Sequence, residues 1–145
     1  YKDMALFIAN EAEKVGLNLK VEVVQPSLLR EWMVSGQVDF FRGSWIADYP
    51  DAENYLSLFY SGNGAPPNYT RFANENFDQL YEEAFAIGEL EDRLSLYEKM
   101  DSILIEEAPV VFLYYDELIR LTHKNIQGVK PNAFNALDLK QVKKY

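Results

Sequence analysis

The sequence predicts a mixed α/β fold, and three observations indicate it. Two apolar stretches near the N-terminus flank a short amphipathic segment, which is typical of strand, helix and strand in succession. Two longer segments with helical spacing occupy the middle of the chain, and apolar runs follow Pro109. At 145 residues the chain is about the size of one domain and is long enough to bury a hydrophobic core.

The N-terminal third is expected to form a strand–helix–strand unit after a first helix. That helix covers residues 3–15 and ends at Gly16, and its apolar stripe is Met4, Phe7, Ile8, Ala12 and Val15. Residues 17–23 alternate apolar and polar side chains, which predicts a half-buried strand. A helix over 26–34 and a strand over 38–46 complete a βαβ unit with parallel strands and a right-handed crossover.

The chain just past the second strand carries the candidate site residues. Ligands of parallel sheets bind at the carboxyl ends of the strands, and Asp48 lies there. A carboxylate flanked by Trp45 and Tyr49 suits a cationic group on an organic ligand. The acid offers a charge-assisted hydrogen bond, and the rings exclude water and add cation–π attraction. A purely structural interpretation stays open, in which Asp48 is a turn acid beside core aromatics.

The remaining elements alternate between helix, loop and strand. Helices are predicted over 52–60, 76–87 and 91–107, with a loop rich in Gly, Pro and Asn over 61–68. Their apolar faces comprise Leu80, Ala84 and Ile87 on the second helix and Leu94, Tyr97, Met100 and Leu104 on the third. Pro109 ends the last helix. Strands are expected over 110–115 and 118–123, joined by a turn near Asp116-Glu117, and near 137–142.

Charge excludes one class of partner. The formal net charge is −9, whereas nucleic-acid binding requires a basic face, so we expect no nucleic-acid partner. Eleven acids lie within residues 71–107 and are interpreted as solvated helix faces, with a face for a protein partner as the alternative. The sequence has no cysteine, which excludes disulfides and thiolate-bound metals. No apolar run approaches the roughly 18 residues that span a bilayer.

Catalysis is a weaker interpretation of the same acids. Asp48, Asp51 and Glu53 are candidates for the acid and base of a glycosidase-type reaction, but Asp51 and Glu53 occupy positions where helix starts attract acids. His123 ends an apolar strand without a patterned partner. Nucleophile, zinc, nucleotide and EF-hand patterns are absent from the sequence. We therefore predict no catalytic residue, no metal ligand and no cofactor.

Three stretches in order carry a resemblance to a known family: "VDFFRGSWIADYPDAENYLSLFYS", "NYTRFANENFDQLYEEA" and "RLSLYEKMDSILIEEAPVVFLYY". They resemble the family 5 extracellular solute-binding proteins, the dipeptide- and oligopeptide-type receptors of bacterial ABC importers. The resemblance runs from about Ala5 to Leu139. The family often has Asp-Pro where this chain has Asp51-Ala52, a change that the first turn of a helix tolerates.

The resemblance implies the C-terminal lobe of a two-lobed, class II periplasmic-binding-protein-like fold, with a mixed sheet flanked by helices. Two such lobes close like a flytrap on a buried ligand. Residues 1–108 would form most of that lobe, and 109–145 would hold terminal strands that return toward the N-terminal lobe. In peptide-binding members the acid matched by Asp48 pairs with the ligand's α-ammonium. Trp45 and Tyr49 are implied as its neighbours in the cleft.

The function implied is capture of a dipeptide or oligopeptide and its delivery to the permease subunits of an ABC importer. The location implied is periplasmic or cell-surface, as a monomer, with a lipid anchor as one option. Two alternatives stay open: a carboxylate-based oligosaccharide hydrolase, and the same receptor with non-peptide cargo such as a nickel complex or an oligosaccharide. Because the first residue is Tyr1 rather than Met, we expect a piece of a longer protein.

Overall fold

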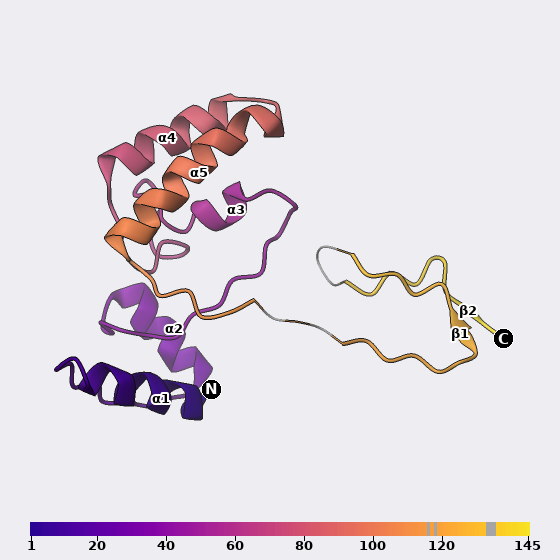
Figure 1. The fold of residues 1–145 in the computed structure, drawn as a ribbon, viewed down its shortest axis with the longest axis horizontal. Coiled ribbons are helices and arrows are strands. Elements are labelled where there is room, and N and C mark those ends of the chain that lie inside the picture. Colours follow the sequence, from indigo (N-terminus) through magenta and orange to yellow (C-terminus); the bar gives the residue numbers. More distant parts are fainter. Residues whose placement is uncertain (116, 118, 133–135) are drawn as a thin grey trace. The chain divides into compact units, whose positions relative to one another are not determined.

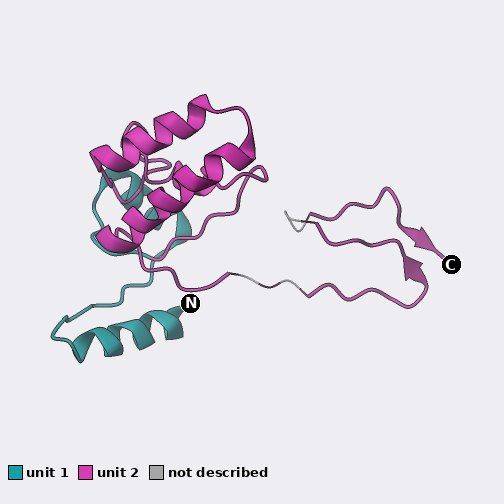
Figure 2. Cartoon of the chain, turned by 45° about the horizontal axis from the view of Figure 1, so that its top comes forward, with its two compact units in different colours: residues 1–41 teal, residues 42–145 magenta. Residues whose placement is uncertain are grey.

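The computed structural model describes residues 1–115, 117, 119–132 and 136–145, which divide into two compact units. Residues 1–41 form the first unit and residues 42–145 the second (Figure 2). The first unit contains helices α1 and α2, and the second contains α3 to α5 and the strands β1 and β2 (Figure 1). Within these described residues, no helix has the length and apolar character needed to cross a membrane.

The first unit contains the two helices that the sequence predicts. Helix α1 is Lys2–Glu13, and the turn after it ends at Gly16, which has a φ of 86° that favours glycine. Helix α2 is Pro26–Ser35, with Pro26 in its first turn and Gly36 in the left-handed conformation at its end. The half-buried face of α1 is Met4, Ala5, Ile8, Ala9 and Ala12.

The predicted apolar stripe of α1 is wrong at two positions. Phe7 is 63% exposed and Val15 is 77% exposed. The buried face follows the spacing i, i+1, i+4 and i+5, whereas the prediction used i and i+3. The face is therefore turned away from Phe7, and Val15 lies beyond the end of the helix.

Three of the predicted strands are not strands in the structure. Residues 17–23, 38–46 and 110–115 are not helical, but they make no ladder hydrogen bonds within the described residues. A strand exists only where its N–H and C=O groups pair with a neighbour, and the described chain supplies no such neighbour. The predicted βαβ unit is therefore not formed here. Part of the predicted 116–117 turn and of the 118–123 strand lies outside the described residues, and 119–123 are irregular.

The helices of the second unit lie close to their predicted positions. Helix α4 is Glu75–Ala86 and α5 is Leu90–Glu107, each within one residue of its predicted bounds. The predicted helix over 52–60 is shorter, because only Glu53–Leu56 is helical (α3) and turns follow over 57–59. The side chain of Asn74 caps α4 by accepting hydrogen bonds from the N–H groups of Asn76 and Phe77 at 3.0 and 3.1 Å.

The core of the second unit lies where α4, α5 and the α3 region meet. Helices α4 and α5 pack side by side, and α3 packs on α5 (Figure 1). The buried apolar residues are Leu56, Phe59, Phe77, Tyr81, Ala84, Leu96, Tyr97, Met100 and Leu104. Phe59, Phe72 and Phe77 meet edge to face, with ring centroids 5.7 to 6.5 Å apart. Of the predicted apolar faces, Leu94 is exposed, because α5 turns Leu96 to the core instead.

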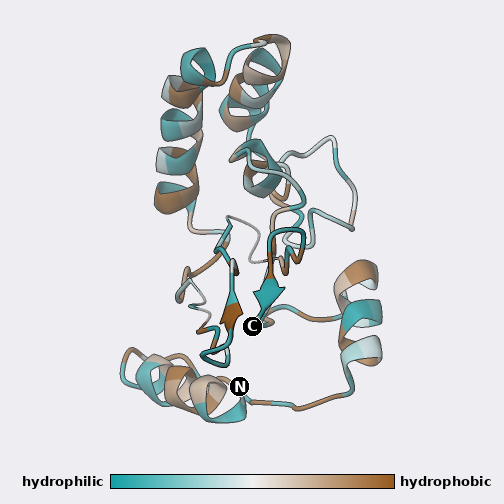
Figure 3. Cartoon of the chain, turned by 90° about the vertical axis from the view of Figure 1, so that its right-hand side faces the viewer, coloured by the Kyte–Doolittle hydropathy of each residue, from teal (hydrophilic) through white to brown (hydrophobic). Residues whose placement is uncertain are grey.

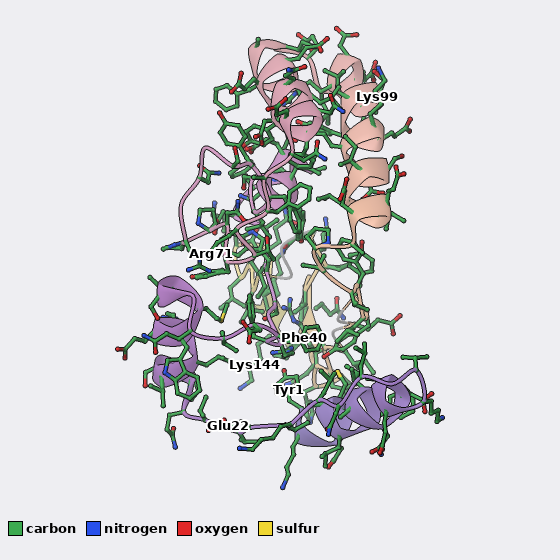
Figure 4. The ribbon with its side chains drawn as sticks, turned by 90° about the vertical axis from the view of Figure 1, so that its left-hand side faces the viewer. Tyr1, Glu22, Phe40, Arg71, Lys99 and Lys144 are labelled. Atoms are coloured by element: carbon green, nitrogen blue, oxygen red, sulfur yellow. The ribbon has the colours of Figure 1, made fainter. Side chains whose placement is uncertain are left out.

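The outer faces of these helices are polar. In Figure 3 apolar and polar residues alternate around the turns of the helices, and in Figure 4 the labelled Lys99 lies on the outer side of α5. Lys99 and most of the acids of α4 and α5 are exposed. The interpretation of 71–107 as solvated helix faces agrees with this exposure.

The predicted loop over 61–68 is ordered by a buried asparagine. Asn68 is 3% exposed, and its side-chain amide donates to the carbonyl oxygens of Tyr60 and Phe72 at 3.2 and 2.9 Å. Its Oδ1 accepts hydrogen bonds from the N–H of Phe72 and from the Thr70 hydroxyl. These bonds satisfy backbone groups that the loop would otherwise bury without partners.

The sheet of the described residues is one antiparallel pair. Strand β1 (Ile126–Gln127) pairs with β2 (Lys143–Lys144), with Ile126 opposite Lys144 (Figure 1). The short strand predicted near 137–142 therefore begins later. Gly128, which follows β1, has a φ of 86°, and a Cβ there would lie 2.1 Å from the carbonyl oxygen of Gln141. Only glycine fits this turn without a backbone shift.

Candidate functional site

One buried amide holds the segment that carries Asp48. Asn54, in α3, is 5% exposed, and its Oδ1 accepts two hydrogen bonds. One comes from the indole Nε1–H of Trp45 at 2.8 Å and the other from the backbone N–H of Asp48 at 3.2 Å. A single oxygen thus fixes both ends of the four-residue stretch from Trp45 to Asp48.

The carboxylate of Asp48 is the free acid of this segment. Asp48 is exposed, and its side chain makes no hydrogen bond or ion pair within the part of the chain that the structure describes. Trp45 is 36% exposed and Tyr49 is 43% exposed. All three predicted site residues therefore lie on one accessible stretch, although only Trp45 and the Asp48 backbone share a hydrogen-bond partner.

Asp51, the next acid, is fully engaged. Its Oδ1 accepts the N–H of Glu53 at 3.0 Å, which agrees with its predicted role at the start of α3. The same oxygen accepts the Tyr97 hydroxyl at 2.9 Å, and Oδ2 lies 2.8 Å from Nη2 of Arg93. Burial raises the pKa of Asp51, but these hydrogen bonds and the Arg93 charge outweigh it and hold the pKa below its ordinary value. Asp51 is thus ionised and structural.

Arg93 and Tyr97 present this contact from one face of α5. They are four residues apart, which places their side chains one above the other. Arg93 Nη1 donates to the Tyr97 hydroxyl at 3.0 Å, and its guanidinium carbon lies 5.8 Å from the centre of the Tyr97 ring. Burial and the bond to Asp51 raise the pKa of Tyr97 to about 12. Tyr97 therefore stays protonated and donates at neutral pH.

Glu53 is engaged by two tyrosines. The hydroxyl of Tyr49 donates to its Oε2, and the hydroxyl of Tyr81, from α4, donates to its Oε1. The bond to Glu53 raises the pKa of Tyr49, and burial followed by the bond to Glu53 raises the pKa of Tyr81 well above its ordinary value. Glu53 therefore links the Asp48 segment to α4 and has a sufficient structural role.

The described residues were also considered as metal ligands and as partners of His123. Within them, no group of three or more His, Asp or Glu side chains is placed to hold a metal ion. His123 is exposed, and its Nδ1 lies 2.7 Å from Oδ1 of Asn125. Neither Asp51 nor Glu53 is left free to act as the partner of Asp48 in acid–base catalysis.

Comparisons with known proteins agree with this picture. A profile described as "Bacterial extracellular solute-binding proteins, family 5 Middle" matches residues 1–67. Dipeptide-binding protein DppE of Bacillus subtilis is 27% identical over 126 residues, which is 87% of this chain and 23% of DppE. The unliganded open form of the periplasmic murein tripeptide-binding protein MppA superposes with a TM-score of 0.68 at 26% identity, over 73% of this chain and 20% of MppA. The N-terminal part of the chain is therefore similar to the family 5 extracellular solute-binding proteins.

Other relatives differ in the ligand that their names give. The probable deoxycholate-binding periplasmic protein YgiS of Escherichia coli is 25% identical over 129 residues, or 88% of this chain and 24% of YgiS. The chain thus spans about a quarter of the length of the curated relatives it matches. The match with MppA confirms the predicted fold class, a lobe of a periplasmic-binding-protein-like fold.

Sequence reasoning missed three residues of this candidate site. Asn54 lies inside the quoted segment, but the sequence of a helix start does not indicate from which groups an asparagine side chain accepts hydrogen bonds. Tyr97 was predicted only as part of an apolar helix face, and Arg93 was not singled out. Their i, i+4 spacing was the available signal, because it places a cation and a phenol on one face, where an acid such as Asp51 finds both.

A separate surface pocket lies along α4. It has a volume of about 380 Å³ and is lined by Tyr60, Asn63, Tyr81, Glu82 and Phe85. Tyr60 stacks on Tyr81 with ring centroids 4.6 Å apart, and its hydroxyl donates to Glu82 at 2.7 Å. None of the predicted site residues lines it. Tyr81 links the pocket to the Asp48 segment through its bond to Glu53.

Proposed function

We propose that this chain forms part of a receptor that captures a dipeptide or oligopeptide and delivers it to the permease of an ABC importer. Residues 1–108 would form most of its C-terminal lobe. Similarity to the family 5 solute-binding proteins supports the receptor role, and DppE and MppA, both named for peptide binding, support the cargo. The names of relatives that include "periplasmic" support a periplasmic or cell-surface location.

The free carboxylate of Asp48 is the observation that carries the proposal. Three acids lie between residues 48 and 53. The carboxylates of Asp51 and Glu53 bind partners within the chain, whereas the carboxylate of Asp48 has no partner among the described residues. An α-ammonium placed against Asp48 would receive a charge-assisted hydrogen bond, which strengthens as a closing second lobe excludes water. Asp48 is therefore our anchor for the N-terminus of the peptide.

Trp45 and Tyr49 would act through their rings and not their polar atoms. The indole N–H of Trp45 is committed to Asn54, and the hydroxyl of Tyr49 is committed to Glu53. What each offers a ligand is an aromatic surface that is about two-fifths exposed. Such surfaces exclude water and attract cations, which suits walls around an ammonium group.

Residues 109–145 would return toward a second lobe. Every described residue from Val111 to Tyr115 is exposed, although all are apolar or aromatic. A run of β-branched and aromatic residues with unpaired backbone is typical of a strand that lacks its neighbour. We propose that strands of the other lobe pair with this run.

Non-peptide cargo and hydrolysis are less well supported. A carboxylate hydrolase needs a second acid about 5 to 9 Å from the first. The two nearby acids in sequence, Asp51 and Glu53, are already bound to Arg93, Tyr97 and two further tyrosines. No described contact favours a nickel complex or an oligosaccharide. Because the relative YgiS is named for deoxycholate binding, the identity of the cargo is the property to test.

A ligand screen of the complete protein tests the proposal. Thermal unfolding would be followed with trialanine, with cellotriose and with a nickel–histidine complex, because a ligand that binds the folded state raises the midpoint by mass action. We expect a rise with trialanine only. A rise with cellotriose or nickel–histidine and none with trialanine or longer peptides would contradict peptide cargo.

A further inference from the structure

We infer that Asn54 is a positioning residue that sets how the site discriminates a free peptide N-terminus. The inference rests on the proposed function, because it concerns the acid that would bind the α-ammonium. Asn54 is 5% exposed and therefore offers little surface to a ligand. It acts through the two donors that converge on its Oδ1, the indole of Trp45 and the backbone N–H of Asp48.

The Oδ1 atom of Asn54 holds the stretch that carries Trp45 and Asp48. Within the described residues, the stretch from 42 to 52 has no helix and no ladder hydrogen bonds. Its C-terminal part is held by the bonds of Tyr49 to Glu53 and of Asp51 to Arg93 and Tyr97, whereas the Asp48 carboxylate has no described partner. Asn54 supplies a fixed point, because it is 5% exposed and belongs to α3, which packs on α5.

Asn54 is held from several sides. Its N–H donates to the Asp51 carbonyl at 3.1 Å, and its carbonyl accepts the Ser57 hydroxyl at 3.0 Å. Two other residues of α3 are also held, since Glu53 binds two tyrosines and Leu56 lies in the core. The Oδ1 therefore has little freedom to follow the Trp45–Asp48 stretch if that stretch moves.

Asp48 and Asn54 would therefore have different roles, one in binding the ligand and the other in positioning the group that binds it. Asp48 supplies the charge, and Asn54 fixes the backbone from which that charge projects. Loss of the Asn54 oxygen would leave the charge in place but let the carboxylate and the Trp45 ring adopt many positions. Affinity for a ligand with an α-ammonium should then fall more than affinity for the same ligand without one, because only the former needs the carboxylate in one place.

The test uses the complete protein with Asn54→Leu, which removes the acceptor, and Asn54→Asp, which retains it. The first measurement is hydrogen exchange of the Trp45 indole N–H, assigned by its loss in Trp45→Phe. We expect fast exchange in Asn54→Leu and protection in wild type and in Asn54→Asp. Protection that survives Asn54→Leu would overturn the inference whatever the peptide data show.

The second measurement is the ratio of the dissociation constants of N-acetyl-trialanine and trialanine. We expect Asn54→Leu to lower this ratio about tenfold, the scale of one lost hydrogen bond, and Asn54→Asp to restore most of it. An equal loss of affinity for both peptides would mean a general structural role and would overturn the inference. If wild type binds neither peptide, the proposed function fails and the claim about discrimination fails with it, while the exchange data still report the contact itself.

Discussion

Arg93 lies 2.8 Å from Asp51, and the two residues are 42 positions apart in a pair that is about four-fifths buried on each side. The contact joins α5 to Asp51, which lies two residues before the start of α3, and Tyr97 adds a second hydrogen bond to Asp51. The acid therefore has a structural explanation that is independent of any ligand. The bonds of Asp51 also help to hold the segment that carries Asp48, three residues earlier in the chain.

Loss of this pair should destabilise the second unit. Asp51→Ala would leave the Arg93 guanidinium largely buried without its carboxylate, and it would remove the acceptor of Tyr97. We expect a loss of about 2–3 kcal/mol in the free energy of unfolding, the scale of hydrogen bonds to charged groups. Urea unfolding of the chain measures it, with Glu83→Gln, a change of an exposed acid on α4, as the matched control. A loss no larger than that of the control would contradict the role given to the pair.

Alkaline pH should weaken the same region through Tyr97. The pKa of Tyr97 is raised to about 12 from an ordinary value of 10.0 by burial and by its bond to Asp51. The folded state thus holds the proton more tightly than the unfolded state. The stabilisation is fully present below pH 10 and is lost as pH rises through about 12.

Ultraviolet titration of the tyrosines and urea unfolding at increasing pH would measure this loss. Tyr97→Phe has no proton to lose, so its stability should fall less steeply above pH 10 than that of the wild type. Tyr81 should also titrate late, since its pKa is raised in the same direction. Equal slopes for wild type and Tyr97→Phe would contradict the assignment.

The stability of the β1–β2 pair should depend on Gly128 and not on Gly64. Gly128→Ala would place a Cβ 2.1 Å from the Gln141 carbonyl oxygen at a φ of 86°. We expect amide exchange of β1 and β2 to become fast while the amides of α4 and α5 keep their protection. Gly64→Ala is the control, because a Cβ at that position meets nothing within 4 Å. Unchanged protection of β1 and β2 would mean that the turn accommodates a side chain.

The helices of this chain could be predicted from sequence far better than its strands. Helix signals are local: Pro26 starts a helix, Gly36 and Pro109 follow helix ends, and apolar residues recur at helical spacing, so α2, α4 and α5 were placed within one or two residues. Strand signals such as the alternation over 17–23 describe a surface that fits a sheet. They do not say whether a partner strand is present, and none is described here.

The candidate site was predictable in part. The choice of Asp48 as anchor follows from the end of an apolar run and from the family resemblance, and it stays a prediction. The structural role of Asp51 followed from its place before a helix, and its bond to the Glu53 N–H agrees. The partners that separate the engaged acids from the free one come from α4 and α5, 28 to 46 positions away, and local pattern carries no record of such distances.

The central claim is that Asp48 binds the α-ammonium of a peptide. Isothermal titration of the complete protein with trialanine and N-acetyl-trialanine tests it most directly, with Asp48→Asn as the variant and Glu83→Gln as the control. We predict that Asp48→Asn loses about 100-fold or more in affinity for trialanine, the cost of leaving a buried charge without its partner, and little for the acetylated peptide. Unchanged affinity for trialanine in Asp48→Asn would contradict the claim.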